Sequence, residues 1–265
     1  MSDAAQSQRS FVVVRGHRLE VERIGGDAAR PTLVFLHEGL GSVSLWKDFP
    51  AEVATATECP AIVYSRYGYG QSDVLEAPFA VDYMHREALE TLPGLLAALA
   101  IERPVLVGHS DGASIALIHA GSRDRLAGLV VLAPHVFVED ISVKSIAEAK
   151  VAFETTDLPE RLARHHADPR RTFYGWNDVW LHPDFRRWNI EAFLPAIRCP
   201  VLAIQGADDE YGTMAQVEAI GRQVGGRCEI VKLAACGHSP HRDQSDATLA
   251  AIVHFVAALP NGGEP

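Results

Sequence analysis

A serine lies at the centre of residues 108–112, which read Gly-His-Ser-Asp-Gly and fit the pattern G-x-S-x-G. An apolar run at residues 104–107 precedes this segment, and a helical pattern begins near Ala113. A sharp turn from a strand into a helix strains the backbone at such a serine and exposes its oxygen, while glycines on either side remove side chains that would collide there. N–H groups at the helix start then favour an anionic intermediate. The pattern predicts that Ser110 is a nucleophile that attacks a carbonyl carbon.

The elements that would position this serine are short apolar runs that alternate with helical patterns. From residue 32 onward several runs are almost continuously apolar, as expected for parallel strands that helices cover on both faces. Residues 15–18 suit the turn of an antiparallel hairpin at a sheet edge. The pattern predicts an α/β fold with strands at residues 11–14, 19–24, 32–36, 61–65, 104–108, 129–133, 201–205 and 229–233, and helices at residues 45–57, 81–100, 113–122, 213–224 and 247–258.

The alternation breaks between about residues 135 and 197, where strand signals vanish. This stretch contains Trp176, Trp180 and Trp188 among charged residues, a mixture typical of helices that face water on one side and an apolar cavity on the other. We therefore expect a helical cap at residues 136–197, inserted into a core domain made of residues 1–135 and 198–265.

Four further segments make the chain resemble the α/β-hydrolase family from the first hairpin to the last helix. They are residues 36–42 (Leu-His-Glu-Gly-Leu-Gly-Ser), 65–72 (Ser-Arg-Tyr-Gly-Tyr-Gly-Gln-Ser), 205–210 (Gln-Gly-Ala-Asp-Asp-Glu) and 236–240 (Cys-Gly-His-Ser-Pro). The second is similar to the family's D-x-x-G-x-G-x-S turn, with Ser65 in place of the aspartate. The resemblance implies a mostly parallel, eight-stranded sheet flanked by helices, with an inserted helical cap.

The resemblance also implies a catalytic triad of Ser110, His238 and Asp209 in the chain order of this fold. His238 would take the serine proton and later return one to the leaving group, and Asp209 would orient the imidazole. Asp208 stays an alternative acid, because adjacent loop carboxylates cannot be told apart without geometry. His241 lies in the histidine loop but lacks the preceding glycine, so a surface or pocket role is expected for it.

The oxyanion hole implied by the resemblance consists of two backbone N–H groups, those of Asp111 and Gly39. Glu38 stands where the family commonly has a glycine, so the second donor stays open between Gly39 and Glu38. Because Glu38 and Asp111 are acidic and flank the expected reaction centre, we hypothesise a preference for neutral or cationic substrates. The expected substrate-binding residues are Glu38, Trp176 and Trp180, and Trp46, Phe137 and Trp188 are further candidates for an apolar lining.

The leading interpretation is a serine hydrolase that cleaves a small or medium carboxylic ester through an acyl-enzyme on Ser110. The same triad serves carbon-carbon bond hydrolysis, thioester cleavage, lactone opening, aminopeptidase action and haloperoxidation in this family, and these alternatives stay open, as does a ligand receptor without turnover. A serine nucleophile argues against the dehalogenase and epoxide hydrolase branches, which use a carboxylate.

Composition excludes several other classes. The formal net charge is -10 and basic residues are scattered, which argues against a nucleic-acid partner. Neither a signal-peptide pattern nor an apolar run long enough to span a bilayer is present, so we expect a cytoplasmic protein without a membrane partner. The four cysteines form no CxxC pair, and Cys236 competes poorly with a serine in a better motif. We expect no metal and no cofactor, and a small-molecule ester as the partner. Whether the chain forms a homo-oligomer stays open.

Overall fold

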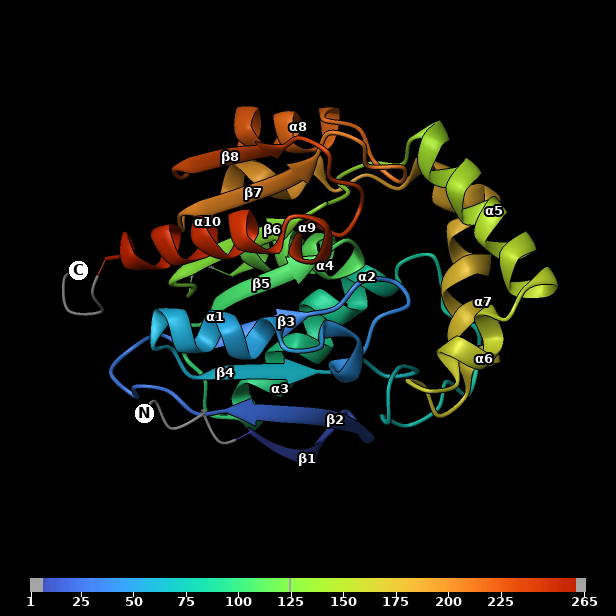
Figure 1. Ribbon diagram of the computed structural model, residues 1–265, viewed down its shortest axis with the longest axis horizontal. Helices are drawn as coiled ribbons and strands as arrows, with labels where there is room; N and C mark the ends of the chain where they lie inside the picture. Colours follow the sequence, from blue (N-terminus) through green and yellow to red (C-terminus); the bar gives the residue numbers. More distant parts are fainter. Residues whose placement is uncertain (1–6, 124, 261–265) are drawn as a thin grey trace.

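The computed structural model describes residues 7–123 and 125–260, so that residues 1–6, 124 and 261–265 of the predicted core domain lie outside the described part. Over the described residues the chain forms one eight-stranded sheet in the order β1-β2-β4-β3-β5-β6-β7-β8 (Figure 1). β2 runs antiparallel to β1 and to β4, and all other neighbouring strands are parallel, so the predicted fold class is confirmed. The strands are β1 (Ser7–Val14), β2 (His17–Ile24), β3 (Leu33–Leu36), β4 (Ala61–Tyr64), β5 (Val105–His109), β6 (Gly128–Leu132), β7 (Val201–Gly206) and β8 (Cys228–Leu233).

The hairpin at the sheet edge is tighter than expected. Its turn consists of Arg15 and Gly16 alone, with φ of 53° and 85°, and Val14 pairs with His17. Positive φ at both central residues is the geometry of a type I′ turn, whose twist matches that of the flanking strands. The four-residue turn predicted for residues 15–18 is therefore wrong by two residues, which belong to β2.

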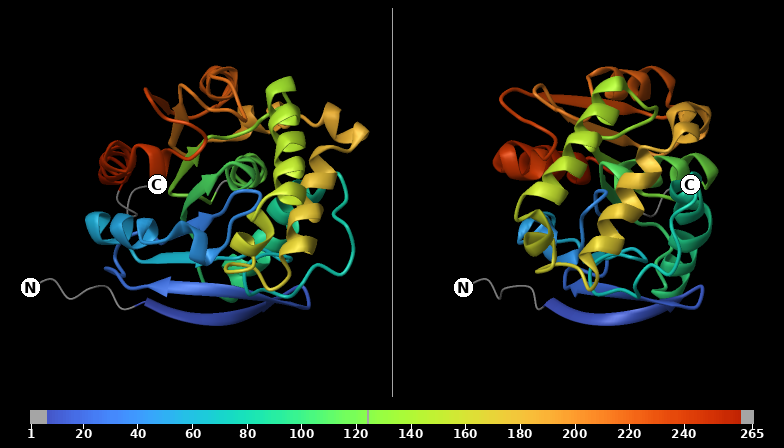
Figure 2. Two further views of the ribbon diagram at one scale, coloured as in Figure 1. Left: turned by 45° about the vertical axis from the view of Figure 1, so that its right-hand side comes forward. Right: turned by 90° about the vertical axis from the view of Figure 1, so that its right-hand side faces the viewer.

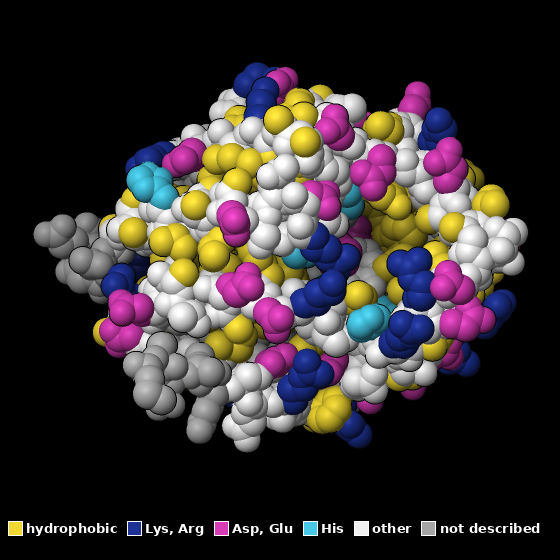
Figure 3. Space-filling model, viewed as in Figure 1, with side chains coloured by type: hydrophobic (Ala, Val, Ile, Leu, Met, Phe, Trp, Pro, Cys, Tyr) yellow, Lys and Arg dark blue, Asp and Glu magenta, His cyan; other side chains and the backbone are white. Residues whose placement is uncertain are grey.

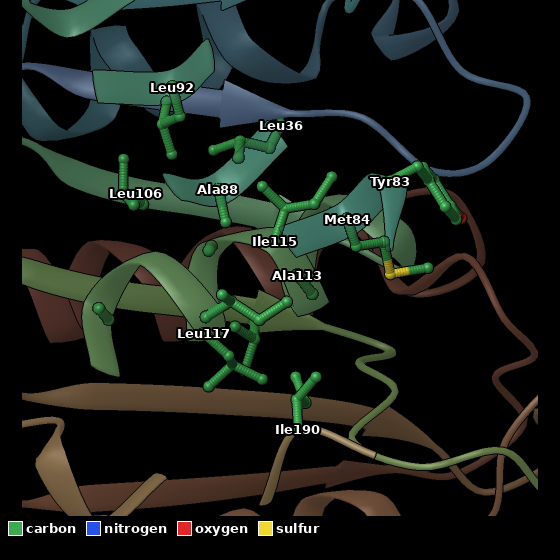
Figure 4. Close-up of a cluster of buried hydrophobic side chains, with 14 of the residues drawn as sticks. Leu36, Tyr83, Met84, Ala88, Leu92, Leu106, Ala113, Ile115, Leu117 and Ile190 are labelled. Carbon is green, nitrogen blue, oxygen red and sulfur yellow. The ribbon is translucent and has the colours of Figure 1, made fainter. Parts of the chain in front are cut away.

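Two layers of helices cover the sheet because its central strands are apolar on both faces. Phe35 and Val107 face the layer of α1 and α10, whereas Leu36 and Leu106 face the layer of α3, α4 and α8. Figure 4 shows Leu36 and Leu106 packed with side chains from α2, α3 and α4 in this second core. The covering helices are α1 (Phe49–Thr57), α2 (Tyr83–Arg86), α3 (Leu92–Ala98), α4 (Asp111–Ser122), α8 (Ala215–Gln223) and α10 (Ser245–Ala257), with the short α9 (Pro240–Asp243) before the last.

The helix predicted at residues 81–100 is present without a gap over residues 83–98, but it is not α-helical throughout. A π-helical turn, η2 (Glu87–Thr91), separates α2 from α3, and Pro93 lies in the first turn of α3. Proline inside a helix lacks an N–H group and its ring would collide with the carbonyl four residues earlier, so the wider π-helical turn before Pro93 accommodates it.

Helices fill the long connection between β6 and β7. They are α5 (Asp140–Thr155), α6 (Leu158–Leu162), α7 (Pro169–Trp180) and the 3-10 turns η3 (Pro183–Arg187) and η4 (Glu191–Ala196), while η1 (Val43–Trp46) lies elsewhere, after β3. Figure 2 shows α5, α6 and α7 side by side beyond the carboxyl ends of the strands. These helices lie within residues 136–197, and the division into core and cap domains stays a prediction.

The face seen in Figure 3 is hollowed between α5–α7 and the carboxyl ends of the strands, and hydrophobic side chains line the floor of this hollow. Parallel α/β sheets bind ligands outside the carboxyl ends of their strands. Within the described residues, none of the helices combines the length and the apolar character that crossing a membrane requires.

Candidate active site

The predicted nucleophile lies at a sharp turn between β5 and α4. Ser110 has φ of 53° and ψ of -117°, a conformation that side-chain-bearing residues rarely adopt. The flanking glycines permit the close packing of this turn. A Cβ atom on Gly108 would lie 2.5 Å from the carbonyl oxygen of Gly112, and one on Gly112 would lie 2.1 Å from that of Leu36. Larger residues at either position would push the turn away from the sheet.

The three side chains of the predicted triad are in hydrogen-bond contact. The distance from Ser110 Oγ to His238 Nε2 is 2.9 Å, and His238 Nδ1 lies 2.9 Å from each carboxylate oxygen of Asp209. The alternative acid, Asp208, is exposed and directs only its backbone N–H into this region, to the carbonyl of Cys236. The chain thus brings together a hydroxyl, an imidazole and a carboxylate from three strand ends.

The carboxylate of Asp209 is held by its own loop. Its Oδ1 accepts the N–H groups of Tyr211 at 2.8 Å and Gly212 at 3.1 Å, and its Oδ2 accepts Gln205 Nε2 at 2.7 Å. Burial raises the pKa of Asp209, but the hydrogen bond and charge of His238 outweigh burial and the net pKa is lowered. The acid is therefore ionised at neutral pH and fixed in orientation.

The pKa of His238 is shifted in the opposite direction to that of Asp209. Burial lowers its pKa, but the hydrogen bond to Asp209 and the charges of Asp209, Glu210 and Glu38 outweigh this effect, so the net pKa lies above its ordinary value. The imidazole is a stronger base than a free histidine, which suits proton abstraction.

The first predicted oxyanion donor, Asp111, follows β5, and the second, predicted as Gly39 with Glu38 as the alternative, follows β3. Among the described residues, neither the N–H of Gly39 nor that of Asp111 donates to a protein acceptor. Asp111 is the first residue of α4, where N–H groups lack partners within the helix. Gly39 lies under the indole of Trp176, because a Cβ at position 39 would lie 2.0 Å from Trp176 Nε1. A glycine at position 39 is therefore required by the helix that covers it.

The side chain of Asp111 does not face a substrate. Its carboxylate accepts the Tyr83 hydroxyl at 2.5 Å and Trp180 Nε1 at 3.2 Å, and lies 3.9 Å from Arg66 Nη2. Burial raises the pKa of this carboxyl. Trp180 was expected to bind substrate, but its indole N–H donates to the carboxylate of Asp111. Of the two acidic residues predicted to flank the reaction centre, only Glu38 therefore remains as a candidate to present charge to a substrate.

The side chain of Glu38 is also partnered. Its Oε2 lies 3.4 Å from His109 Nδ1, and its Oε1 lies 3.8 Å from Arg242 Nη2. Burial raises the pKa of Glu38, yet the hydrogen bond from His109 and the nearby cationic groups hold it well below its ordinary value. Glu38 is therefore ionised, and it joins the oxyanion loop to the segment that follows His238.

The other aromatic candidates are mostly packing residues. Trp46 is 2% exposed and contacts the rings of Phe35, Phe49 and His241 in the core on the α1 side of the sheet. Trp188 stacks on the ring of Phe185.

Two residues that the motifs do not identify lie against His238. The ring of Tyr211 is centred 4.7 Å from that of His238, and the ring of His135 is 5.7 Å away. Burial lowers the pKa of His135 to about 3, so this imidazole is neutral. Both follow the carboxyl end of a strand, β7 or β6, and that position is the signal that could have identified them.

Ser65 stands where the D-x-x-G-x-G-x-S turn has an aspartate, and another residue supplies the missing carboxylate. Glu20, on β2, accepts the hydroxyl of Ser65 at 2.8 Å and the N–H of Gln71 at 3.0 Å. Ser65 Oγ also accepts the N–H of Val43 at 2.9 Å, which ties this turn to the segment after β3. The turn thus keeps a buried acid, supplied by a neighbouring strand.

No group of three or more His, Cys, Asp or Glu side chains within residues 7–123 and 125–260 is arranged to hold a metal ion.

Comparisons with known proteins identify similar sequences and structures. An sn-1-specific diacylglycerol lipase, ABHD11, of Mus musculus is 26% identical over 149 residues, which are 56% of this chain and only 47% of that relative. A pimeloyl-[acyl-carrier protein] methyl ester esterase of Xylella fastidiosa (strain 9a5c) is 25% identical over 203 residues, 64% of this chain and 78% of the relative. The solved structure of 2-hydroxy-6-oxo-6-phenylhexa-2,4-dienoate hydrolase from Rhodococcus sp. strain RHA1 has a TM-score of 0.78 at 17% identity, covers 96% of this chain and 100% of its own, and is evidence for the fold alone. A family model described as "Alpha/beta hydrolase family" matches residues 33–251. Since this match includes every strand from β3 to β8 and all three positions of the predicted triad, the chain belongs to the alpha/beta hydrolase family.

Proposed function

We propose that this protein hydrolyses a carboxylic ester of small or medium size through an acyl-enzyme on Ser110. The observation that carries the proposal is the unbroken contact from Ser110 Oγ through His238 to Asp209, together with the N–H groups of Gly39 and Asp111, which have no protein acceptor among the described residues. Such a constellation activates a hydroxyl and stabilises the charge that develops on a carbonyl oxygen.

The first half of the reaction forms the acyl-enzyme. Ser110 Oγ attacks the carbonyl carbon of the ester while its proton passes to His238 Nε2, and the carbonyl π electrons move onto oxygen. The resulting tetrahedral oxyanion accepts hydrogen bonds from Gly39 and Asp111. When the carbon-oxygen double bond forms again, the bond to the alcohol breaks and the alcohol oxygen takes the proton from His238 Nε2.

The second half releases the acid. A water molecule gives a proton to His238 Nε2 as it attacks the acyl carbon, and the oxyanion forms a second time. Its collapse breaks the bond to Ser110 Oγ, which receives the proton from His238. Asp209 stays ionised throughout and stabilises the protonated imidazole in both halves.

The proposed substrate class rests on two supports. The hollow between α5–α7 and the strand ends has a hydrophobic floor, which suits an acyl chain rather than a highly charged group. Similarity to a methyl ester esterase supports an ester of a small alcohol.

The test is release of nitrophenol from a series of short to medium nitrophenyl acyl esters by the wild-type protein and by Ser110→Ala. We expect saturable turnover that Ser110→Ala lowers by at least about a thousandfold. Cys236→Ser is the matched control, because it changes another side chain of the histidine loop, a buried free thiol that the mechanism does not use. Mass spectrometry of a slowly deacylating ester should find the acyl group on Ser110.

Two outcomes contradict the proposal. Slow release that Ser110→Ala leaves unchanged would favour a ligand-binding protein without turnover. Ser110-dependent cleavage of thioesters, lactones, amides or carbon-carbon bonds, with carboxylic esters left intact, would assign a different reaction to the same triad.

A further inference from the structure

Arg66 is a buried arginine beside the candidate active site that the proposed reaction does not use directly. It is 2% exposed and follows the carboxyl end of β4. Its guanidinium donates through Nη1 to the carbonyl oxygen of His37 and through Nη2 to that of Glu38 at 3.1 Å. Its carbon Cζ lies 4.8 Å from the ring centre of Tyr69, within the range of a cation-π contact. Burying a cationic group costs free energy, so a buried guanidinium whose N–H groups are held by several partners requires an explanation.

The first consequence concerns the peptide that joins Glu38 to Gly39. The carbonyl oxygen of Glu38 accepts three hydrogen bonds, from Arg66 Nη2, from His37 Nδ1 at 2.7 Å and from the N–H of Gly41 at 3.1 Å. In a trans peptide the N–H points opposite to the carbonyl, so the N–H of Gly39 points away from Arg66. This orientation leaves the Gly39 N–H free for a carbonyl oxygen bound at Ser110. A flipped peptide would lose three acceptor contacts and direct an N–H at a cation.

His37 supports the same orientation. Its Nε2 accepts the backbone N–H of Arg66 at 3.0 Å, which leaves the ring proton on Nδ1 for donation to Glu38. Burial lowers the pKa of His37 well below its ordinary value, and the charge of Arg66 lowers it further. The imidazole therefore stays neutral, with one acceptor and one donor nitrogen.

The second consequence concerns the other oxyanion donor. The guanidinium lies 3.9 Å from the carboxylate of Asp111, whose backbone N–H begins α4. Tyr83 and Trp180 donate to the same carboxylate, and Trp180 ends the helix α7 that lies beyond the strand ends. Arg66 thus contacts both segments that supply a donor, the Glu38–Gly39 peptide by hydrogen bonds and Asp111 by charge.

We infer that Arg66 is a positioning residue that fixes the oxyanion hole by holding the Gly39 N–H in its productive orientation while it neutralises Asp111. The inference rests on the proposed function, because an oxyanion hole matters only if an acyl transfer occurs at Ser110. It also predicts that α7 is coupled to the hole through the Trp180–Asp111 hydrogen bond.

The kinetic test compares Arg66→Lys with Arg66→Met, Trp180→Phe and the wild type. Arg66→Lys keeps a charge but loses the fork, and one oxyanion donor contributes about a hundredfold to a thousandfold in kcat. We expect kcat to fall by about tenfold to a hundredfold, KM to change by less than about twofold, and affinity for a trifluoromethyl ketone, which forms a tetrahedral oxyanion with the serine, to fall in parallel with kcat. Arg66→Met should lower kcat at least as far, whereas Trp180→Phe removes one of several contacts to Asp111 and should lower it by about tenfold or less.

The matched control is Arg171→Lys. Arg171 on α7 also donates a guanidinium N–H to a backbone carbonyl, that of Leu75 at 3.0 Å, but its charged partner is Asp168 and it makes no hydrogen bond or ion pair to either donor segment within the described residues. Its substitution should leave kcat and ketone affinity unchanged. Circular dichroism and reaction with a serine-directed fluorophosphonate would verify that each variant is folded with an accessible Ser110.

The kinetic outcomes that overturn the inference are a wild-type kcat and ketone affinity in folded Arg66→Lys and Arg66→Met, or a loss confined to KM. A crystal structure of Arg66→Lys gives a readout that does not depend on turnover. A Glu38–Gly39 peptide in the wild-type orientation would overturn the role of Arg66, and a turned peptide would support it. Absence of any Ser110-dependent turnover in the wild type would instead remove the proposed function.

Discussion

Replacing Ser110 by glycine should leave the protein more stable than replacing it by alanine. The reason is the backbone of the turn between β5 and α4, where Ser110 has φ of 53° and ψ of -117°. A residue with a Cβ pays a steric penalty in this region, whereas glycine adopts it freely. Both substitutions remove the hydroxyl and its contact with His238, so this loss cancels in the comparison.

The magnitude follows from two opposing terms. Relief of strain at a sparsely populated backbone conformation contributes about 1–3 kcal/mol. The greater freedom of glycine in the unfolded chain costs about 0.5–1 kcal/mol relative to alanine. The difference favours Ser110→Gly by about 1 kcal/mol, which corresponds to a Tm about 2–4 °C higher for a chain of this size class.

Urea unfolding followed by circular dichroism would measure the difference. Ser114 provides the matched control, because it lies in the interior of the same helix α4. At that position glycine should be less stable than alanine by about 1 kcal/mol. If Ser110→Gly were also less stable than Ser110→Ala by a similar amount, the turn would carry no strain that glycine relieves, and the reasoning would be refuted.

Three further predictions concern the chemistry and its supports. Because Asp209 contributes to a pKa of His238 above the ordinary 6.5, the acidic limb of the pH profile of kcat/KM should lie above that pH. Asp209→Asn should move this limb to lower pH and lower kcat by about ten-thousandfold. A limb that stays in place would contradict the role of Asp209 as the acid that raises the pKa of His238. Gly39→Ala should destabilise the protein by about 1–3 kcal/mol in urea unfolding, because the new methyl group meets the indole of Trp176. A combined Gly39→Ala, Trp176→Ala variant should recover part of that loss. Strictly additive losses of the two single variants would argue against the contact. A chelator should leave ester hydrolysis unchanged, because protein groups perform every proton transfer in the proposed mechanism, and a chelator-sensitive rate that added metal restores would contradict it.

Most of the fold could be predicted because its signals are local. Central strands such as β5 and β7 are apolar on both faces, so their runs stand out from the helices between them and their ends are predicted to within about two residues. The turn that holds Ser110 is local only in part, since Gly108 is required by backbone atoms of Gly112 and Ala113 within the turn, whereas Gly112 is required by the carbonyl of Leu36 on β3. The helix expected at residues 81–100 is present over residues 83–98, but the π-helical turn within it could not be predicted, because it changes the backbone hydrogen bonds without breaking the apolar pattern.

The surroundings of the predicted triad depend on distant segments. Asp208 and Asp209 are equivalent as residue types, and only the path of the loop turns one toward His238 and the other toward solvent. Glu20 replaces the acid missing at Ser65 from a strand whose sequence shows no sign of this role.

The sequence by itself determined which residues form the predicted triad and their order along the chain, because a serine between glycines, a carboxylate and a histidine each lie at the end of an apolar run. Only the tertiary structure decided what surrounds them. Asp111 was expected to present charge to a substrate, but the structure directs it to Trp180 and Arg66. Such pairings depend on which side chains meet across the carboxyl edge of the sheet, and their separation along the chain carries no information about that meeting.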